Sequence, residues 1–244
     1  MKKYFNDKAN IFRFQKKNDV LIIRPHVKKL IPKSLKSKLI IADVEDIVDY
    51  KFIVPGEHQR ENLACAVEVA KQFKIPEAEI KKTVKNFKGL EGRLQYLKTF
   101  KGIKIYNDNN ATTPEATIAG IRALEEENGE ENPTSPRLRR ARIILISGGA
   151  DKKLDLDLYV KVVNTFGKAV VLIPGTGTDK LMTNYKLRIT NERAKNLKEA
   201  VKKSLGLAGR GDIILFSPAF ASFGQFNNEY ERNDLFMKIV KSLK

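Results

Sequence analysis

Apolar runs and amphipathic segments alternate along most of the second part of the chain. The amphipathic segments have helical periodicity, whereas the apolar runs are short and continuous, as in strands buried on both faces. The first two runs are joined by a Lys-Gly turn and resemble a strand pair. The pattern predicts strands at 94–100, 103–108, 142–149, 169–175 and 212–218, helices at 113–127, 155–166, 196–208 and 233–243, and a loop at 128–140. Such alternation requires a largely parallel sheet covered by helices on both faces. We therefore predict a Rossmann-like α/β domain over residues 91–244.

The first part of the chain has a different pattern. Two short apolar runs, at 19–25 and 37–44, precede helical patterns at 58–73 and 76–87. The first helix is expected to bury Leu63, Ala66, Val67 and Ala70, and the second Ile80, Val84 and Phe87. The segment KGLEGR that follows carries two glycines and predicts a hinge. We therefore expect a separate domain over residues 1–90.

Composition narrows the class of protein. The 244 residues are 42% apolar, which supports buried cores, and no apolar run reaches the length of a membrane span or of a signal peptide. The single cysteine, Cys65, excludes an internal disulfide and is expected to be a packed helix residue. Only two histidines are present, His26 and His58, so a histidine metal cluster in the second domain is excluded. We expect a cytoplasmic protein without membrane contact.

The formal net charge is +17, which by itself suggests a polyanionic partner. The lysines, however, are scattered, without the aromatic residues of single-strand binders or a known nucleic-acid-binding motif. A lysine-rich solvated surface, or a basic cleft for phosphorylated small molecules, is favoured over nucleic acid.

Four polar loops follow predicted strands, and ligands of open α/β sheets bind at the carboxyl ends of strands. The loops read YNDNNATT, SGGADKK, PGTGTDK and SPAFASFGQF. Gly148 and Gly149 either end a strand tightly or admit a ligand, beside Lys152 or Lys153 as a cation for a carboxylate or phosphate. The sequence contains no G-x-x-x-x-G-K-[ST] phosphate-binding loop, and nothing at triad spacing supports a nucleophilic role for Ser217 or Ser222.

These loops, with GEHQRENLACAV and FKGLEGRLQYL, occur in the order and spacing of the Mur ligases of peptidoglycan synthesis. The chain resembles that family over nearly its whole length, and the ending SPAFASFGQFNNEYERNDLF is most similar to the members that add D-glutamate. The resemblance implies an ATP- and Mg²⁺-dependent ligase. Such a ligase phosphorylates the carboxylate of UDP-N-acetylmuramoyl-L-alanine, and the amine of D-glutamate then attacks the acyl phosphate.

The resemblance also implies roles for individual residues. Arg93 matches the hinge arginine that reaches the ATP phosphates, Asp108 the acid that holds the ribose, and Asn62 the asparagine near the adenine. Lys152 matches the lysine that binds the carboxylate of the incoming amino acid. The remaining matches are Ser222 and Phe226, for the D-glutamate pocket, and Lys8, for a carbamylated lysine that helps to hold Mg²⁺.

The sequence departs from the family in two ways. The phosphate-binding loop, the metal-holding glutamate and histidine and the UDP-binding domain have no counterpart, so the chain resembles a C-terminal portion with a remnant of the central ATP-binding domain. We expect no ligation by the chain alone. The chain is expected to be either a fragment, or the product of a split or misannotated gene whose N-terminal half is supplied in trans. We also expect an open apolar sheet edge in residues 1–90. Asn110 also replaces a family lysine. The alternative is a noncatalytic basic module that binds a nucleotide or polyanion; a folate polyglutamate-type ligase is disfavoured by the SPAFASFGQF ending.

Overall fold

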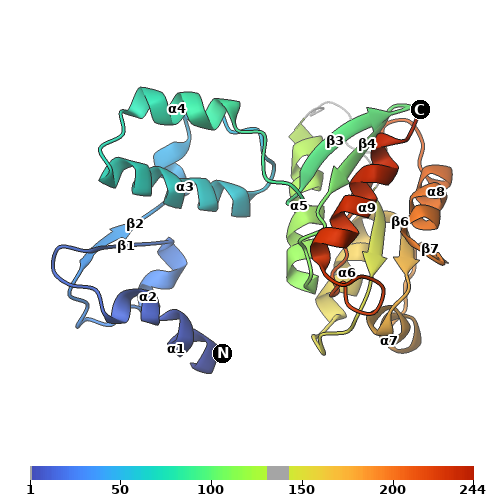
Figure 1. Cartoon of the computed structure of the whole chain (residues 1–244), viewed down its shortest axis with the longest axis horizontal. Helices are drawn as coiled ribbons and strands as arrows, with labels where there is room; N and C mark the ends of the chain where they lie inside the picture. The colour runs from blue at the N-terminus through green and yellow to red at the C-terminus, as the bar shows by residue number, and fades with distance from the viewer. Residues whose placement is uncertain (1, 131–142) are drawn as a thin grey trace. The chain divides into compact units, whose positions relative to one another are not determined.

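A computed structural model describes residues 2–130 and 143–244, which form two compact units. The first unit comprises residues 1–53 and 57–87, and the second comprises 54–56 and 88–244 (Figure 1). The assignment of residues 1–90 to a central ATP-binding domain stays a prediction. The loop expected at 128–140 lies mostly outside the described residues. None of the described helices is long and apolar enough to cross a membrane.

The first unit combines a small parallel sheet with two longer helices. Its elements are α1 (Lys2–Lys8), α2 (Asn10–Arg13), β1 (Val20–Ile23), the 3-10 helix η1 (Pro25–Leu30), β2 (Lys38–Ile41), the 3-10 helix η2 (Val44–Ile47), α3 (Glu57–Gln72) and α4 (Glu77–Asn86). Leu63 and Val67 of α3 are buried as expected, but Ala64 takes the place of Ala66 in the core. Ile80 and Val84 of α4 close the same core.

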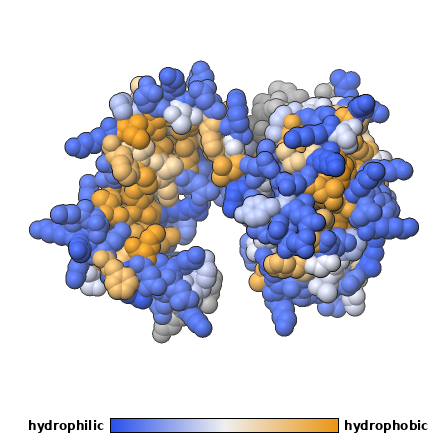
Figure 2. All heavy atoms as spheres, viewed as in Figure 1, coloured by the Kyte–Doolittle hydropathy of each residue, from blue (hydrophilic) through white to orange (hydrophobic). Residues whose placement is uncertain are grey.

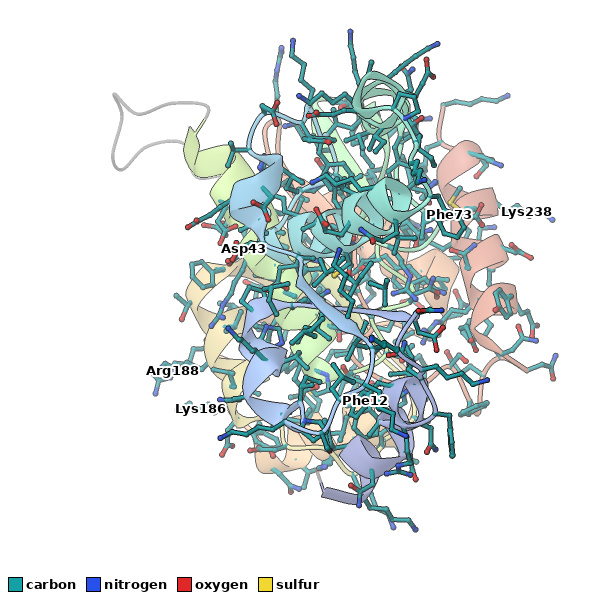
Figure 3. All side chains as sticks on the ribbon, turned by 90° about the vertical axis from the view of Figure 1, so that its left-hand side faces the viewer. Phe12, Asp43, Phe73, Lys186, Arg188 and Lys238 are labelled. Carbon is teal, nitrogen blue, oxygen red and sulfur yellow. The ribbon has the colours of Figure 1, made fainter. Side chains whose placement is uncertain are left out.

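The surface of the first unit carries many apolar side chains. Phe14 and Phe73 are each 78% exposed, and Ile11 and Val48 are each 73% exposed. Apolar residues gather over one face of this unit (Figure 2), and Figure 3 looks onto the unit, with Phe73 labelled just beyond the end of α3. β1 and β2 pair only with each other among the described residues, so both outer edges of this sheet are unpaired.

The second unit is built on a six-stranded sheet in the order β3-β4-β8-β5-β6-β7. All neighbours are parallel except β3 and β4, which form an antiparallel pair. The elements are β3 (Gln95–Phe100), β4 (Ile103–Asn107), α5 (Pro114–Glu130), β5 (Ile143–Gly148), α6 (Asp157–Phe166), β6 (Gly167–Ile173), α7 (Thr176–Asn184), β7 (Thr190–Arg193), α8 (Leu197–Leu207), β8 (Ile213–Phe216) and α9 (Glu229–Lys241).

Helices cover both faces of this sheet, as the continuous apolar strands predict (Figure 1). Successive strand residues alternate between two cores: Leu145 belongs to the core under α5, α6 and α7, and Ile144 and Ile146 belong to the core under α8 and α9. A strand buried on both sides has no polar face, which is why its sequence does not alternate. The predicted α/β fold class is confirmed.

Two elements of the second unit differ from the sequence expectation. The segment read as the loop PGTGTDK is largely the first turns of α7, which begins at Thr176. β7 was not predicted because Thr190–Arg193 has no apolar pattern; it is an edge strand whose side chains are mostly exposed.

Candidate functional site

The carboxyl ends of β4, β8, β5 and β6 meet at one edge of the sheet because these four strands are parallel neighbours. The loops after β4, β5 and β8 surround a pocket of about 300 Å³ there, within the second unit. Its lining residues are Arg93, Asn110, Thr112, Lys152, Ala221, Ser222, Phe223, Glu229 and Tyr230. Three of the predicted site residues, Arg93, Lys152 and Ser222, therefore lie around one cavity.

Arg93 reaches this edge because β3 runs antiparallel to β4. Gln95 at the start of β3 pairs with Asn107 at the end of β4, so the residues just before β3 lie beside the β4 loop. Residues 91–94, which lead into β3, are called the entry segment below. Asn110 holds this segment: its main-chain N–H donates to Gly92 O (2.9 Å), and its side-chain amide donates to Glu91 O (3.3 Å). The last residues of the expected hinge segment KGLEGR are therefore hydrogen-bonded to the β4 loop of the second unit. Arg93 itself is exposed and lines the pocket.

Lys152 joins two walls of the pocket. Its Nζ donates to Thr112 Oγ1 at 2.8 Å, which connects the β5 loop to the β4 loop. Gly149 brings the β5 loop against the β8 loop: its φ is +135°, and a Cβ there would lie 2.3 Å from Ala221 O. The glycines of SGGADKK therefore permit the approach of neighbouring backbone. That observation favours the tight-strand-end interpretation of Gly148 and Gly149.

A buried arginine that the sequence analysis did not single out connects α9 to the β4 and β8 loops. Arg232 of α9 is fully buried and donates from Nε to Asn109 Oδ1 (2.8 Å), from Nη2 to Asn109 O (2.9 Å) and from Nη1 to Phe220 O (3.4 Å). Burial lowers the pKa of this guanidinium to about 10, so it stays charged at neutral pH. The only signal for it was its place in the ending NNEYERNDLF.

The run of asparagines in the β4 loop is explained largely by this network. Asn107 Oδ1 accepts from the main-chain N–H of Asn109 (3.1 Å), and Asn109 Nδ2 donates to Glu229 O (2.9 Å). Both asparagines have no exposed surface. Only Asn110 of the run lines the pocket. Asn107 and Asn109 therefore hold the loop in place, although the loop as a whole follows a strand at the edge where ligands bind.

Asp108 belongs to the β4 loop but does not line the pocket, and 8% of its surface is exposed. Its Oδ1 accepts from the main-chain N–H of Leu94 (3.0 Å), and its Oδ2 accepts from Ser217 Oγ (2.8 Å). Burial raises the pKa of this carboxyl to about 7, against the opposing effects of the two hydrogen bonds and of the Arg93 charge. Asp108 therefore fixes the entry segment that carries Arg93, and each of its oxygens already has a partner. Contact with a ribose stays a prediction.

The remaining predicted residues do not line this pocket. Phe226 is half-buried and packs against the core under α8 and α9. Lys8 and Asn62 belong to the first unit and are exposed. Lys8 Nζ lies 5.5 Å from the ring centroid of Tyr4, and Asn62 accepts a hydrogen bond from Arg24. Their proposed roles stay predictions.

The cofactors implied by the resemblance fit the described residues unequally. Arg93 is an exposed cation at the pocket, which suits a nucleotide phosphate. No group of three or more His, Cys, Asp or Glu side chains suited to a metal ion occurs in the part of the chain that the structure describes. The residues present therefore do not by themselves make a Mg²⁺ site around Lys8.

The site is a pocket at the carboxyl edge of a mostly parallel sheet, lined by Arg93 and Lys152, and this edge is where open α/β domains bind their ligands. Curated relatives named UDP-N-acetylmuramoylalanine--D-glutamate ligase match most of the chain. That of Thermoanaerobacter sp. (strain X514) is 36% identical over 206 residues, covering 83% of this chain and 42% of the relative. That of Caldanaerobacter subterraneus subsp. tengcongensis is 35% identical over 240 residues, covering 97% and 48%.

Solved structures agree on the fold. MurF ligase from Thermotoga maritima in complex with ADP gives a TM-score of 0.67 at 14% identity, covering 98% of this chain and 58% of that one. The bifunctional folylpolyglutamate synthase/dihydrofolate synthase from Yersinia pestis, complexed with AMPPNP and Mn ion, gives 0.65 at 11% identity, covering 96% and 55%. No family model matches the sequence.

The chain thus belongs to the Mur ligase family. Within it, the sequence is like that of the D-glutamate ligases, and it spans about half the length of the curated relatives it matches.

Proposed function

We propose that the second unit is the amino-acid-binding part of an ATP-dependent ligase that joins D-glutamate to UDP-N-acetylmuramoyl-L-alanine in peptidoglycan synthesis. The observation that carries the proposal is the convergence of Arg93, Lys152 and Ser222 around one pocket of about 300 Å³. A cavity of this size suits an amino acid, and two cations suit a ligand rich in carboxylate or phosphate oxygens.

In this proposal each group has a separate task. Lys152, already oriented by its hydrogen bond to Thr112, binds a carboxylate of D-glutamate, and the buried Ser222 hydroxyl provides a further contact. Arg93 lies on the entry segment and contacts the phosphates of ATP. When ATP is bound, it supplies the phosphoryl group that turns the substrate carboxylate into an acyl phosphate. The cations of the pocket favour the negative charge that collects there.

We further propose that ligation needs a polypeptide that carries a phosphate-binding loop and the metal ligands. The chain itself contains no G-x-x-x-x-G-K-[ST] sequence, and the described residues offer no metal cluster. The first unit offers apolar contact area for such a polypeptide, since Phe14, Phe73 and Val48 are largely exposed and both outer edges of its sheet are unpaired among the described residues.

The experiment is a reconstitution. The 244-residue chain is coexpressed with the phosphate-loop half of a related D-glutamate ligase, and ADP release is measured with and without D-glutamate. The proposal expects ADP release that depends on both polypeptides, on D-glutamate and on the UDP-linked substrate. If the copurified pair releases no ADP while the chain binds nucleic acid in a salt-sensitive manner, the ligase proposal fails and the basic binding module replaces it.

A further inference from the structure

The pocket wall contains an acidic residue that the proposed function leaves unused. Glu229 stands in the first turn of α9 and lines the same cavity as Arg93 and Lys152. Its main chain is fixed, because its carbonyl oxygen accepts from Asn109 Nδ2 at 2.9 Å. Its carboxylate forms no ion pair with a lysine or arginine of the described residues. Asp151 in the β5 loop differs, because its carboxylate pairs with Lys180 of α7.

Glu229 has a structural role that must be separated from ligand binding. A carboxylate in the first turn stabilises a helix through the helix dipole, and the charge of Glu229 raises the pKa of the buried Arg232 guanidinium against the larger effect of burial. Glu231 occupies the same turn and shares the dipole effect, but its Oε2 accepts from the main-chain N–H (2.8 Å) and the side-chain Nδ2 (2.9 Å) of Asn227. It does not line the pocket, which makes it a matched reference.

The charges around the pocket mirror those of one class of ligand. Arg93 and Lys152 contribute two positive charges, and Glu229 contributes one negative charge. An amino dicarboxylic acid carries two carboxylates and one ammonium group. A dicarboxylate without an amine would leave Glu229 without a counterion and bring a like charge into the same cavity, which is unfavourable.

We propose that Glu229 binds the ammonium group of the incoming amino acid and thereby selects amino dicarboxylic acids over dicarboxylic acids that lack the amine. The inference rests on the proposed function, because it requires this pocket to be the amino-acid site. Binding at Glu229 also directs the nitrogen that must later attack toward the α9 wall. One carboxylate then faces Lys152, and the other faces Arg93 as long as no phosphate occupies that arginine.

The test compares two ligands that differ only in the amine, D-glutamate and glutarate. Each is titrated into the isotope-labelled 244-residue chain, and dissociation constants are taken from the NMR shifts of pocket amides. The wild-type chain should bind D-glutamate about fivefold more tightly than glutarate, the size of a partly exposed ion pair. Glu229→Gln should lose this preference, chiefly by weaker D-glutamate binding, and Glu231→Gln should keep it.

The possible results distinguish failure of the inference about Glu229 from failure of the proposed amino-acid-binding function. If neither ligand shifts the pocket amides of the wild-type chain, the pocket is not an amino-acid site, and both proposals fail. If the wild-type chain binds both ligands equally, the amine is not recognised and only the inference about Glu229 is overturned. A preference retained in Glu229→Gln has the same meaning. The wild-type comparison needs no variant, so a folding defect in Glu229→Gln does not remove the test.

Discussion

Asp108→Asn should stabilise the second unit at neutral pH while leaving its hydrogen bonds in place. The amide oxygen of the variant can accept from Leu94 N–H, as Asp108 Oδ1 does now. The amide nitrogen can donate to Ser217 Oγ, whose own proton can turn to Thr117 Oγ1, at 2.8 Å. The exchange therefore removes a buried negative charge while keeping both hydrogen bonds of the side chain.

The size of the effect follows from the raised pKa of Asp108. The carboxyl titrates at about 7 in the folded chain against 3.8 for an ordinary aspartate, so between these values the folded state binds the proton and the unfolded state does not. Stability therefore falls as the pH rises from about 4 to about 7 and is constant above that range. At roughly 1.4 kcal/mol per unit of pKa difference, the upper bound is about 4 kcal/mol. We expect a gain of about 2 to 4 kcal/mol at pH 8 and little change near pH 4.

Hydrogen exchange of the β4 and β8 amides, measured from pH 5 to 8, reports the opening free energy of this sheet without interference from the first unit. Asp212→Asn is the matched control: Asp212 is 9% exposed, against 8% for Asp108, but it forms an ion pair with Lys168 at 2.5 Å. The control should destabilise the sheet at pH 8. A loss of stability in Asp108→Asn at pH 8, or a gain that does not change with pH, would refute the reasoning.

Three further substitutions test the walls of the pocket. Gly149→Ala places a Cβ 2.3 Å from a main-chain oxygen of the β8 loop, so the free energy of unfolding in urea should fall by on the order of 3 kcal/mol. The control is Gly206→Ala, in open space on α8, which should not lower this free energy. Arg232→Lys keeps the charge but loses the planar group that donates to three oxygens, so unfolding should become easier by about 2 kcal/mol; unchanged stability would contradict the assigned contacts. Lys152→Ala should weaken D-glutamate use in the reconstituted enzyme about tenfold while leaving ATP use nearly unchanged, with Lys153→Ala as control; equal losses for both substrates would mean that its role is misassigned.

Much of the second unit could be predicted because its strands are apolar on both faces and its helices have a clear period. β7 could not, since a polar edge strand such as Thr190–Arg193 is specified by main-chain pairing with β6 and not by its side chains. α7 was read as a loop because its first turn, Thr176-Gly177-Thr178, consists of residues more typical of turns than of helices. Local pattern carries little information about either element.

The site divides in a similar way. Arg93, Lys152 and Ser222 were chosen by resemblance, and their position around one pocket follows from strand order, which the predicted parallel sheet anticipated in part. Arg232 and Glu229 were not chosen, because their importance comes from contacts across more than a hundred residues of sequence. A single chain offers no local signal that a charged helix residue will point into a core or a cavity.

The dependence of two loops on Arg232 bears on the order in which this protein is made and folded. β4 pairs with β8, and the loops that follow both strands are tied by a side chain from the last helix. On the ribosome, β4 and its asparagine-rich loop emerge roughly a hundred residues before the strand and helix that complete them. The pocket can therefore form only after α9 has left the exit tunnel, and a nascent chain stalled before α9 would carry Arg93, Lys152 and Ser222 without the pocket that they line.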